Sequence, residues 1–113
     1  MTLTDLTTIC HQDSVDAGWW DNPPPFVVPI KLMLIVSEIS EAMEADRRSM
    51  MDDKLSHRLG IEVELADAIV RICDLAGYLN LDLEGALVEK MQYNKQREDH
   101  KPSVRAATGG KKY

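Results

Sequence analysis

Apolar and polar positions follow the 3.6-residue period of an α-helix along most of this chain. The first such stretch predicts a helix from about Thr4 to Asp16, with Thr2 or Thr4 as its N-cap. Gly18 and three consecutive prolines at 23–25 then interrupt the pattern, because proline has no backbone N–H to donate inside a helix. This segment is therefore expected to be an ordered turn or an extended arm.

Three further helical patterns follow the prolines, at about Pro29–Arg48, Lys54–Tyr78 and Leu83–Arg97. Asp52 or Asp53 is the expected cap of the third helix, and Asp82 that of the fourth. Neither strand alternation nor an internal repeat is present. The sequence therefore predicts an all-α, four-helix bundle-like fold.

The second and third helices carry more apolar surface than one core-facing stripe needs. A chain of 113 residues is large enough for one domain but would struggle to cover both helices alone. Self-association through helix faces is therefore expected. Residues 1–98 are predicted to form the single domain, and residues 99–113 a flexible basic tail with Lys101, Arg105, Lys111 and Lys112 and no acid.

The charge balance excludes some classes of partner. The chain has 19 acidic and 13 basic residues and a net charge of −6, so its body has little to offset a nucleic-acid backbone. Cys10 and Cys73 lie far apart and belong to no zinc-type cluster, so reduced thiols are expected. The sequence shows no leader-like segment and no run of 18 apolar residues. We therefore expect a cytoplasmic protein with neither nucleic-acid nor membrane partners.

Two acidic pairs, Glu38-x-x-Glu41 and Glu64-x-x-Asp67, lie inside the two most apolar helical stretches. Residues three apart share a helix face, with Cβ atoms roughly 5–6 Å apart. Facing carboxylates repel, so the arrangement is costly in apolar surroundings unless a cation neutralises them. The pairs predict a Mg²⁺ site between two helices, with two or more ions because four carboxylates are too many for one, and Mn²⁺ could substitute. The alternative is a pair of solvated helix faces.

Other residue types suit a phosphorylated ligand. Lys90, Asn94 and Arg97 have the spacing i, i+4, i+7 and form one polar stripe that could bind phosphates, or could simply be a solvated outer face. Lys31 lies on the same side of its helix as Glu38 and could neutralise a phosphate or offset the glutamates. One indole of the Trp19-Trp20 pair could stack on a nucleobase, or pack the turn against the helices.

Arg71 lies at i+4 from Asp67 and three residues before Asp74. An ion pair within the helix, with either aspartate, is as consistent with this spacing as a catalytic role. Glu62 is rotated about 200° from Glu64 on a helix and is expected to face away from the site.

These motifs together resemble the all-α nucleoside triphosphate pyrophosphatases, the MazG-like superfamily. The acidic pairs are separated by 22 residues, Gly18-Trp19-Trp20 resembles the aromatic turn of dCTP pyrophosphatase-like members, and Lys31 precedes the glutamates as it often does in the family. The stretch from Glu64 to Ala76 is close to the family's third helix, and Lys90-Met91-x-x-Asn94-x-x-Arg97 to its last. The resemblance covers about residues 15–98.

The resemblance implies Mg²⁺-dependent hydrolysis of a nucleoside triphosphate, particularly a dNTP, to the monophosphate and diphosphate in nucleotide-pool cleansing. It implies a homodimer or homotetramer with sites near the subunit interfaces. The segment Glu98-Asp99-His100-Lys101 departs from the family's usual proline-led run, which puts the tail's part in closing the pocket in doubt. The residues that it implies are the metal ligands Glu38, Glu41, Glu64 and Asp67, one of which could orient the water, the phosphate or sugar contacts Lys90, Asn94 and Arg97, and Trp19 or Trp20 at the base.

A dimetal carboxylate oxidase generally needs Glu-x-x-His pairs, and neither Glu38 nor Glu64 is followed by a histidine at i+3. A non-catalytic acidic helical module that binds a nucleotide or a partner remains the main alternative to the enzyme.

Overall fold

The computed structural model describes residues 1–97, 99 and 101–111 of the chain. The helices of this part are α1 (Leu3–Asp16), α2 (Val27–Arg47), α3 (Gly60–Tyr78), α4 (Leu83–Gln96) and α5 (Pro102–Ala106). None of these described residues belongs to a β-sheet, although Met51 and Leu59 form an isolated bridge. The predicted all-α class is confirmed, whereas the MazG-like bundle topology stays a prediction.

The chain divides into two compact units, Met1–Leu81 and Asp82–Tyr113. Helices α1, α2 and α3 belong to the first unit, and α4 and α5 to the second. The predicted boundary between residues 98 and 99 stays a prediction. Glu98, His100 and the tail residues Lys112 and Tyr113 lie outside the described residues, and the described part of the predicted tail includes the short helix α5.

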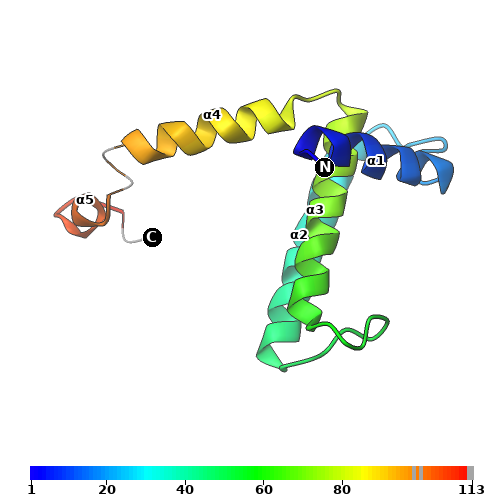
Figure 1. Ribbon diagram of the computed structural model, residues 1–113, viewed down its shortest axis with the longest axis horizontal. Helices are drawn as coiled ribbons and strands as arrows, with labels where there is room; N and C mark the ends of the chain where they lie inside the picture. The colour runs from blue at the N-terminus through cyan, green and yellow to red at the C-terminus, as the bar shows by residue number, and fades with distance from the viewer. Residues whose placement is uncertain (98, 100, 112–113) are drawn as a thin grey trace. The chain divides into compact units, whose positions relative to one another are not determined.

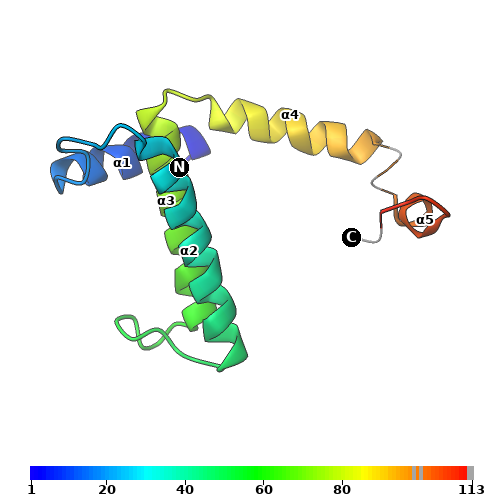
Figure 2. The ribbon, with the colours of Figure 1, turned by 180° about the vertical axis from the view of Figure 1, so that it is seen from behind.

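In the first unit, α2 and α3 lie side by side and run in opposite directions, and α1 crosses the C-terminal part of α3 (Figure 1 and Figure 2). The crossing is close because residue 77 is a glycine. A Cβ atom there would lie only 2.6 Å from the Cβ of His11 and 2.8 Å from the carbonyl oxygen of Thr7. Carbon atoms in favourable contact are about 3.5–4.0 Å apart, so a larger residue would push α1 away.

Two of the expected helix caps are confirmed. The Thr2 side chain accepts a hydrogen bond from the Asp5 N–H at 3.0 Å, and the Asp5 carboxylate accepts one from the Thr2 N–H, which is a capping box. Asp82 caps α4 through the Gly85 N–H at 2.9 Å. Helix α2 begins at Val27, two residues earlier than expected, and Pro29 lies in its first turn, where no intrahelical donor is needed.

The prediction that the third helix begins near Lys54 is wrong, because α3 begins at Gly60. Asp52 Oδ2 accepts hydrogen bonds from the N–H groups of Lys54 at 3.0 Å and Leu55 at 2.6 Å and so stabilises a turn in place of a helix. The expected cap by Asp52 or Asp53 is also wrong: Leu59 precedes α3, and its side chain makes no capping hydrogen bond.

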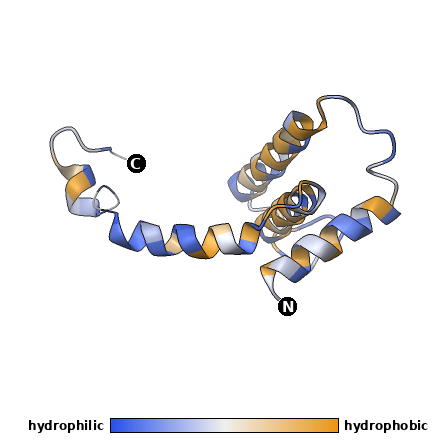
Figure 3. Ribbon diagram, turned by 90° about the horizontal axis from the view of Figure 1, so that it is seen from above, coloured by the Kyte–Doolittle hydropathy of each residue, from blue (hydrophilic) through white to orange (hydrophobic). Residues whose placement is uncertain are grey.

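The buried apolar side chains of the described residues are mostly small: Val27, Ala42, Ala68, Cys73, Leu75 and Ala76. Hydrophobic residues nevertheless recur along α2 and α3 (Figure 3), and many of the large ones are exposed. Cys73 is buried, Cys10 is half-buried, and both thiols are free. Among the described residues, no helix is both long and apolar enough to cross a membrane.

Candidate functional site

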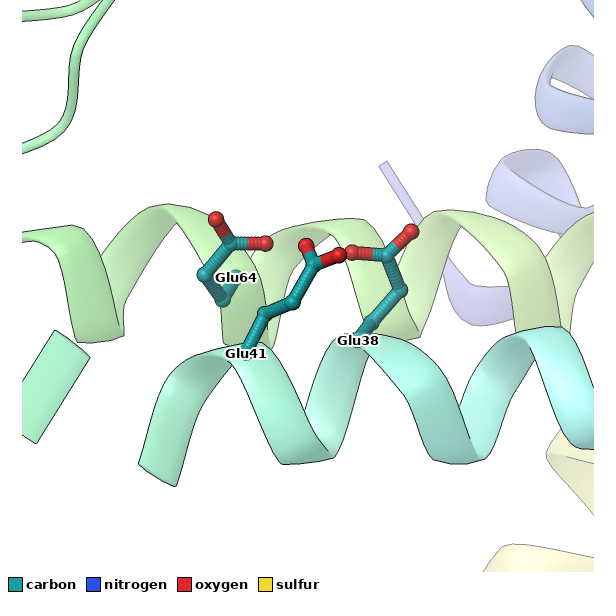
Figure 4. A group of neighbouring side chains, drawn as sticks. All are labelled: Glu38, Glu41 and Glu64. Carbon is teal, nitrogen blue, oxygen red and sulfur yellow. The ribbon is translucent and has the colours of Figure 1, made fainter. Parts of the chain in front are cut away.

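Three of the predicted carboxylates come together between α2 and α3. Glu38 and Glu41 extend from neighbouring turns of α2 and Glu64 from α3, and their side chains converge (Figure 4). One oxygen from each of the three lies within 4.8 Å of the others. The i, i+3 spacing brings Glu38 and Glu41 to one face of α2, and the packing of α3 beside α2 adds Glu64. We call these three residues the carboxylate cluster.

Glu38 is the buried member of the cluster, and its charge is compensated. Arg71 Nε on α3 donates a hydrogen bond of 2.6 Å to Glu38 Oε1. Burial by itself would raise the pKa of Glu38. Hydrogen bonds to its carboxylate from Arg71 and Glu64, the positive charge of Arg71 and a hydrogen bond with Glu41 together outweigh burial and hold that pKa below its ordinary value. Glu38 is therefore a carboxylate even in its buried position.

Glu64 shows the opposite behaviour. Burial is the largest cause that raises the pKa of Glu64, to about 7. The protonated Glu64 carboxyl also donates hydrogen bonds to the Glu41 and Glu38 carboxylates, and the negative charges of these two groups raise the pKa further. Without a cation, the cluster therefore holds a proton at Glu64 through much of the acidic range. A divalent ion among the three carboxylates would remove the repulsion that favours this proton.

Asp67, the fourth predicted ligand, lies one turn after Glu64 on α3 and outside the group of three. Partial burial and then the charge of Glu38 raise the pKa of Asp67, while the charge of Arg71 opposes the shift. Asp67 shares its surroundings with Glu38, because both line the cavity described next.

A cavity of about 700 Å³ lies next to the cluster, within the first unit. Its wall includes residues of α1, the turn after α1, α2 and α3. Small-molecule sites are typically about 300–1,000 Å³, so the volume suits a ligand of nucleotide size. Four of the predicted site residues line this cavity: Trp19, Lys31, Glu38 and Asp67.

The structure distinguishes the two tryptophans. The Trp20 ring stacks on Tyr78, with centroids 4.0 Å apart and planes at 8°, and its Nε1 donates to Asp74 Oδ1 at 2.8 Å. Trp20 therefore packs the turn against α3. Of the two roles that the sequence allowed for an indole here, stacking on a base or packing the turn, Trp20 has the second. Trp19 is 73% exposed and lines the cavity.

Some residues around the cavity were not assigned to the site from the sequence. Asp74 is buried beside the cavity and is held by His11 Nδ1 at 2.9 Å as well as by Trp20. Arg71 also lines the cavity, and it forms an ion pair with Glu38 on another helix. A pair within α3 was only one of the alternatives left open by the sequence. The sequence signal that could have placed Asp74 at the site is its position two turns after Asp67, on nearly the same helix face. Its contact with His11 could not be predicted in this way, because that contact depends on the crossing of α1 and α3.

Glu62 lies on α3 like Glu64 but does not belong to the carboxylate cluster. It forms an ion pair of 3.2 Å with Arg58, and both side chains are about half exposed. This pair resembles an ordinary solvent-exposed ion pair and offers a natural comparison with Arg71–Glu38.

Lys90, Asn94 and Arg97 belong to the second unit. The Lys90 ammonium and the Arg97 guanidinium lie 4.9 and 5.5 Å from the ring centroid of Tyr93, and Arg97 pairs with Asp99. Asn94 Oδ1 is buried without a hydrogen-bond partner among the described residues. The role of these residues at the cavity of the first unit stays a prediction.

Comparisons with protein-family models, with curated proteins and with solved structures found no match to this chain. Membership of the MazG-like superfamily therefore stays a prediction from the sequence motifs.

Proposed function

We propose that this protein is a cytoplasmic, Mg²⁺-dependent nucleoside triphosphate pyrophosphohydrolase of the MazG-like type. Its substrate would be a dNTP, which it would hydrolyse to the monophosphate and diphosphate. Its role would be the cleansing or balancing of a nucleotide pool. The observation that carries the proposal is the convergence of Glu38, Glu41 and Glu64 within 4.8 Å, next to a cavity of about 700 Å³.

The donor set fits a hard divalent cation. All three groups are carboxylates, and Mg²⁺ prefers oxygen ligands. Burial, together with the neighbouring Glu41 and Glu38 carboxylates, raises the pKa of Glu64 to about 7, so this position favours a neutralised carboxyl group. Glu38, Glu41 and Glu64 would hold the ion, with Asp67 as a further ligand for it or for a second ion. A bound cation of this kind neutralises phosphate charge and makes water a better nucleophile.

Residues of the cavity wall would bind the nucleotide. Lys31 would offset phosphate charge as a point charge, and Trp19 would stack on the base through its exposed ring. By the resemblance, Lys90, Asn94 and Arg97 would add contacts to the phosphates or sugar.

The bond cleaved would be the one between the α- and β-phosphates. The water oxygen would bond to the α-phosphorus as the bond to the bridging oxygen breaks, and diphosphate would leave. Asp67 is our candidate for orienting the water, through the carboxylate oxygen that does not bind an ion, because it lines the cavity and lies outside the group of three carboxylates.

The exposed apolar surface supports a homodimer or homotetramer. On α2, one stripe spaced i, i+4, i+7, i+11 remains exposed, and α3 carries a second stripe. A second copy of the chain would cover such surface. The stripe on α2 consists of Leu32, Val36, Ile39 and Met43, and that on α3 of Leu65, Ile69 and Ile72.

The first experiment is to incubate the full chain with each common dNTP and NTP, with and without Mg²⁺. We expect Mg²⁺-dependent release of diphosphate and monophosphate, with dNTPs ranked first. Release of orthophosphate and a nucleoside diphosphate would contradict the bond assignment. Nucleotide binding without any product would favour the non-catalytic binding module.

A further inference from the structure

The ion pair between Arg71 and Glu38 is unequal in its exposure. The Glu38 side chain is 9% exposed, whereas the Arg71 side chain is 40% exposed and lines the cavity. The hydrogen bond at 2.6 Å uses Arg71 Nε. A guanidinium also carries N–H donors on both Nη atoms, so Arg71 has the means to bind a second group while near Glu38.

Arg71 and a divalent cation would compete for the same carboxylate. Glu38 belongs to the carboxylate cluster, and the Arg71 guanidinium is the positive charge that compensates its carboxylate in this structure. A cation bound by Glu38 would make this charge redundant and would also repel the guanidinium. Arg71 would then be free to pair with another anion in the cavity that it lines.

We propose that Arg71 is a phosphate-binding residue that is held on Glu38 until a divalent cation takes its place. The inference rests on the proposed function for the identity of the phosphate, which is that of the nucleotide. Arginine suits the role because its planar fork can bind two phosphate oxygens at once. Binding of the cation thereby prepares the cavity for the triphosphate.

A purely structural ion pair would behave differently. Arg58–Glu62 is such a pair, with side chains 58% and 47% exposed, and the cavity lining does not include either residue. Loss of Arg58 should change neither cation nor nucleotide binding. Loss of Arg71 should strengthen cation binding, because a competitor for Glu38 is removed. It should weaken nucleotide binding, because a phosphate ligand is removed.

The test uses Arg71→Gln, Arg71→Lys and the matched control Arg58→Gln in the full chain. Mn²⁺ alone is titrated at pH 8 by electron paramagnetic resonance, without nucleotide. We expect Arg71→Gln to bind Mn²⁺ roughly tenfold more tightly than the original chain, a factor in keeping with the loss of one modest ion pair. Arg71→Lys keeps the competing charge and should remain near the original affinity, as should Arg58→Gln.

The second titration uses an α,β-imido dNTP, which resists hydrolysis, at saturating Mn²⁺. We expect Arg71→Gln to bind it about 10- to 100-fold more weakly, with Arg71→Lys in between. Unchanged or weaker Mn²⁺ binding by Arg71→Gln would overturn the competition. Tighter Mn²⁺ binding with unchanged affinity for the analogue would overturn the phosphate-binding role.

Both titrations are separate from turnover. If the two expected shifts occur in a chain that releases no diphosphate, the role of Arg71 stands and the proposed hydrolysis fails. Circular dichroism of each variant, recorded with and without Mn²⁺, controls for folding. If Arg71→Gln loses its helical signal, recovery with Mn²⁺ supports the proposal, because the cation then replaces the missing charge, and no recovery overturns it.

Discussion

Trp20 lies flat on Tyr78, with ring centroids 4.0 Å apart and an angle of 8° between the planes. Its Nε1 donates to Asp74 at 2.8 Å, so ring stacking and a hydrogen bond together attach the turn after α1 to the end of α3. Trp19, the preceding residue, makes no comparable ring contact among the described residues and is 73% exposed. The two adjacent tryptophans therefore have different surroundings.

Replacing each tryptophan by alanine should separate stability from nucleotide binding. Trp20→Ala should lower the free energy of unfolding by about 3 kcal/mol, because it removes stacked apolar surface and leaves Asp74 with one donor fewer. Trp19→Ala should change it by less than about 0.5 kcal/mol, since the side chain is exposed. Urea denaturation followed by circular dichroism measures both values.

Nucleotide affinity should follow the opposite order among folded variants. Trp19→Ala should weaken binding of the α,β-imido dNTP about tenfold if its indole stacks on the base. Trp19→Phe keeps an aromatic face and should retain most of the affinity. Equal affinities of Trp19→Ala and the original chain would remove Trp19 from the proposed base pocket.

The stability of the cation-free protein should fall through neutral pH because of Glu64. The folded-state pKa of Glu64 is raised to about 7 from an ordinary value of 4.5, so the folded state holds this proton more tightly than the unfolded state. The contribution is full below about pH 4.5 and is lost as the pH rises through about 7. Urea midpoints between pH 5 and 8 in EDTA measure it, with Glu64→Gln as the variant in which this fall should vanish.

Added Mg²⁺ should reverse this trend. The cation requires the ionised form of Glu64, so the rise in melting temperature that it causes should increase as the pH passes about 7. A stabilisation by Mg²⁺ that does not change between pH 5.5 and 8 would contradict the cluster as its binding site.

Loss of one cluster carboxylate should remove turnover without unfolding the chain. Glu41→Gln keeps the size of an exposed side chain and deletes one ligand charge, so we expect activity to fall by more than about 100-fold, beyond the usual effect of an outer-shell change. Helical circular dichroism should stay the same. Glu62→Gln, which alters only the Arg58 pair, is the matched control and should keep full activity. Near-full activity of Glu41→Gln would make the metal assignment wrong.

Self-association should depend on the exposed stripe of α2. Ile39→Glu places a charge in the middle of this stripe and should shift the protein from an oligomer towards a monomer in analytical ultracentrifugation. Thr8→Glu adds the same charge at an exposed position of α1, outside this stripe, and should leave the oligomer intact. A monomeric original chain would refute the proposed assembly.

Local patterns predicted much of the helical structure and part of the site. Helical periodicity indicated α1, α2 and α4 to within a few residues, because the signal lies within each segment. Thr2 and Asp82 were recognisable as caps, since each bonds a backbone group three residues away. The i, i+3 acidic pairs likewise placed their carboxylates on common faces before any packing was known.

These local patterns could not predict contacts between different helices. The sequence by itself determined the all-α class and the residues that could form a carboxylate cluster, because both follow from helical geometry. Only the tertiary structure decided that Arg71 pairs with Glu38, because this contact requires α3 to pack against α2. It also decided that Asp74 forms hydrogen bonds with His11 and Trp20, because these contacts require α1 and the turn after it to pack against α3. The late start of α3 has a local cause, the turn in which Asp52 accepts hydrogen bonds from the Lys54 and Leu55 N–H groups. The close approach of Gly60 to α2, where a Cβ would lie 2.9 Å from that of Ala45, depends on packing. Spacing determines which side chains share a face, whereas packing determines what that face meets.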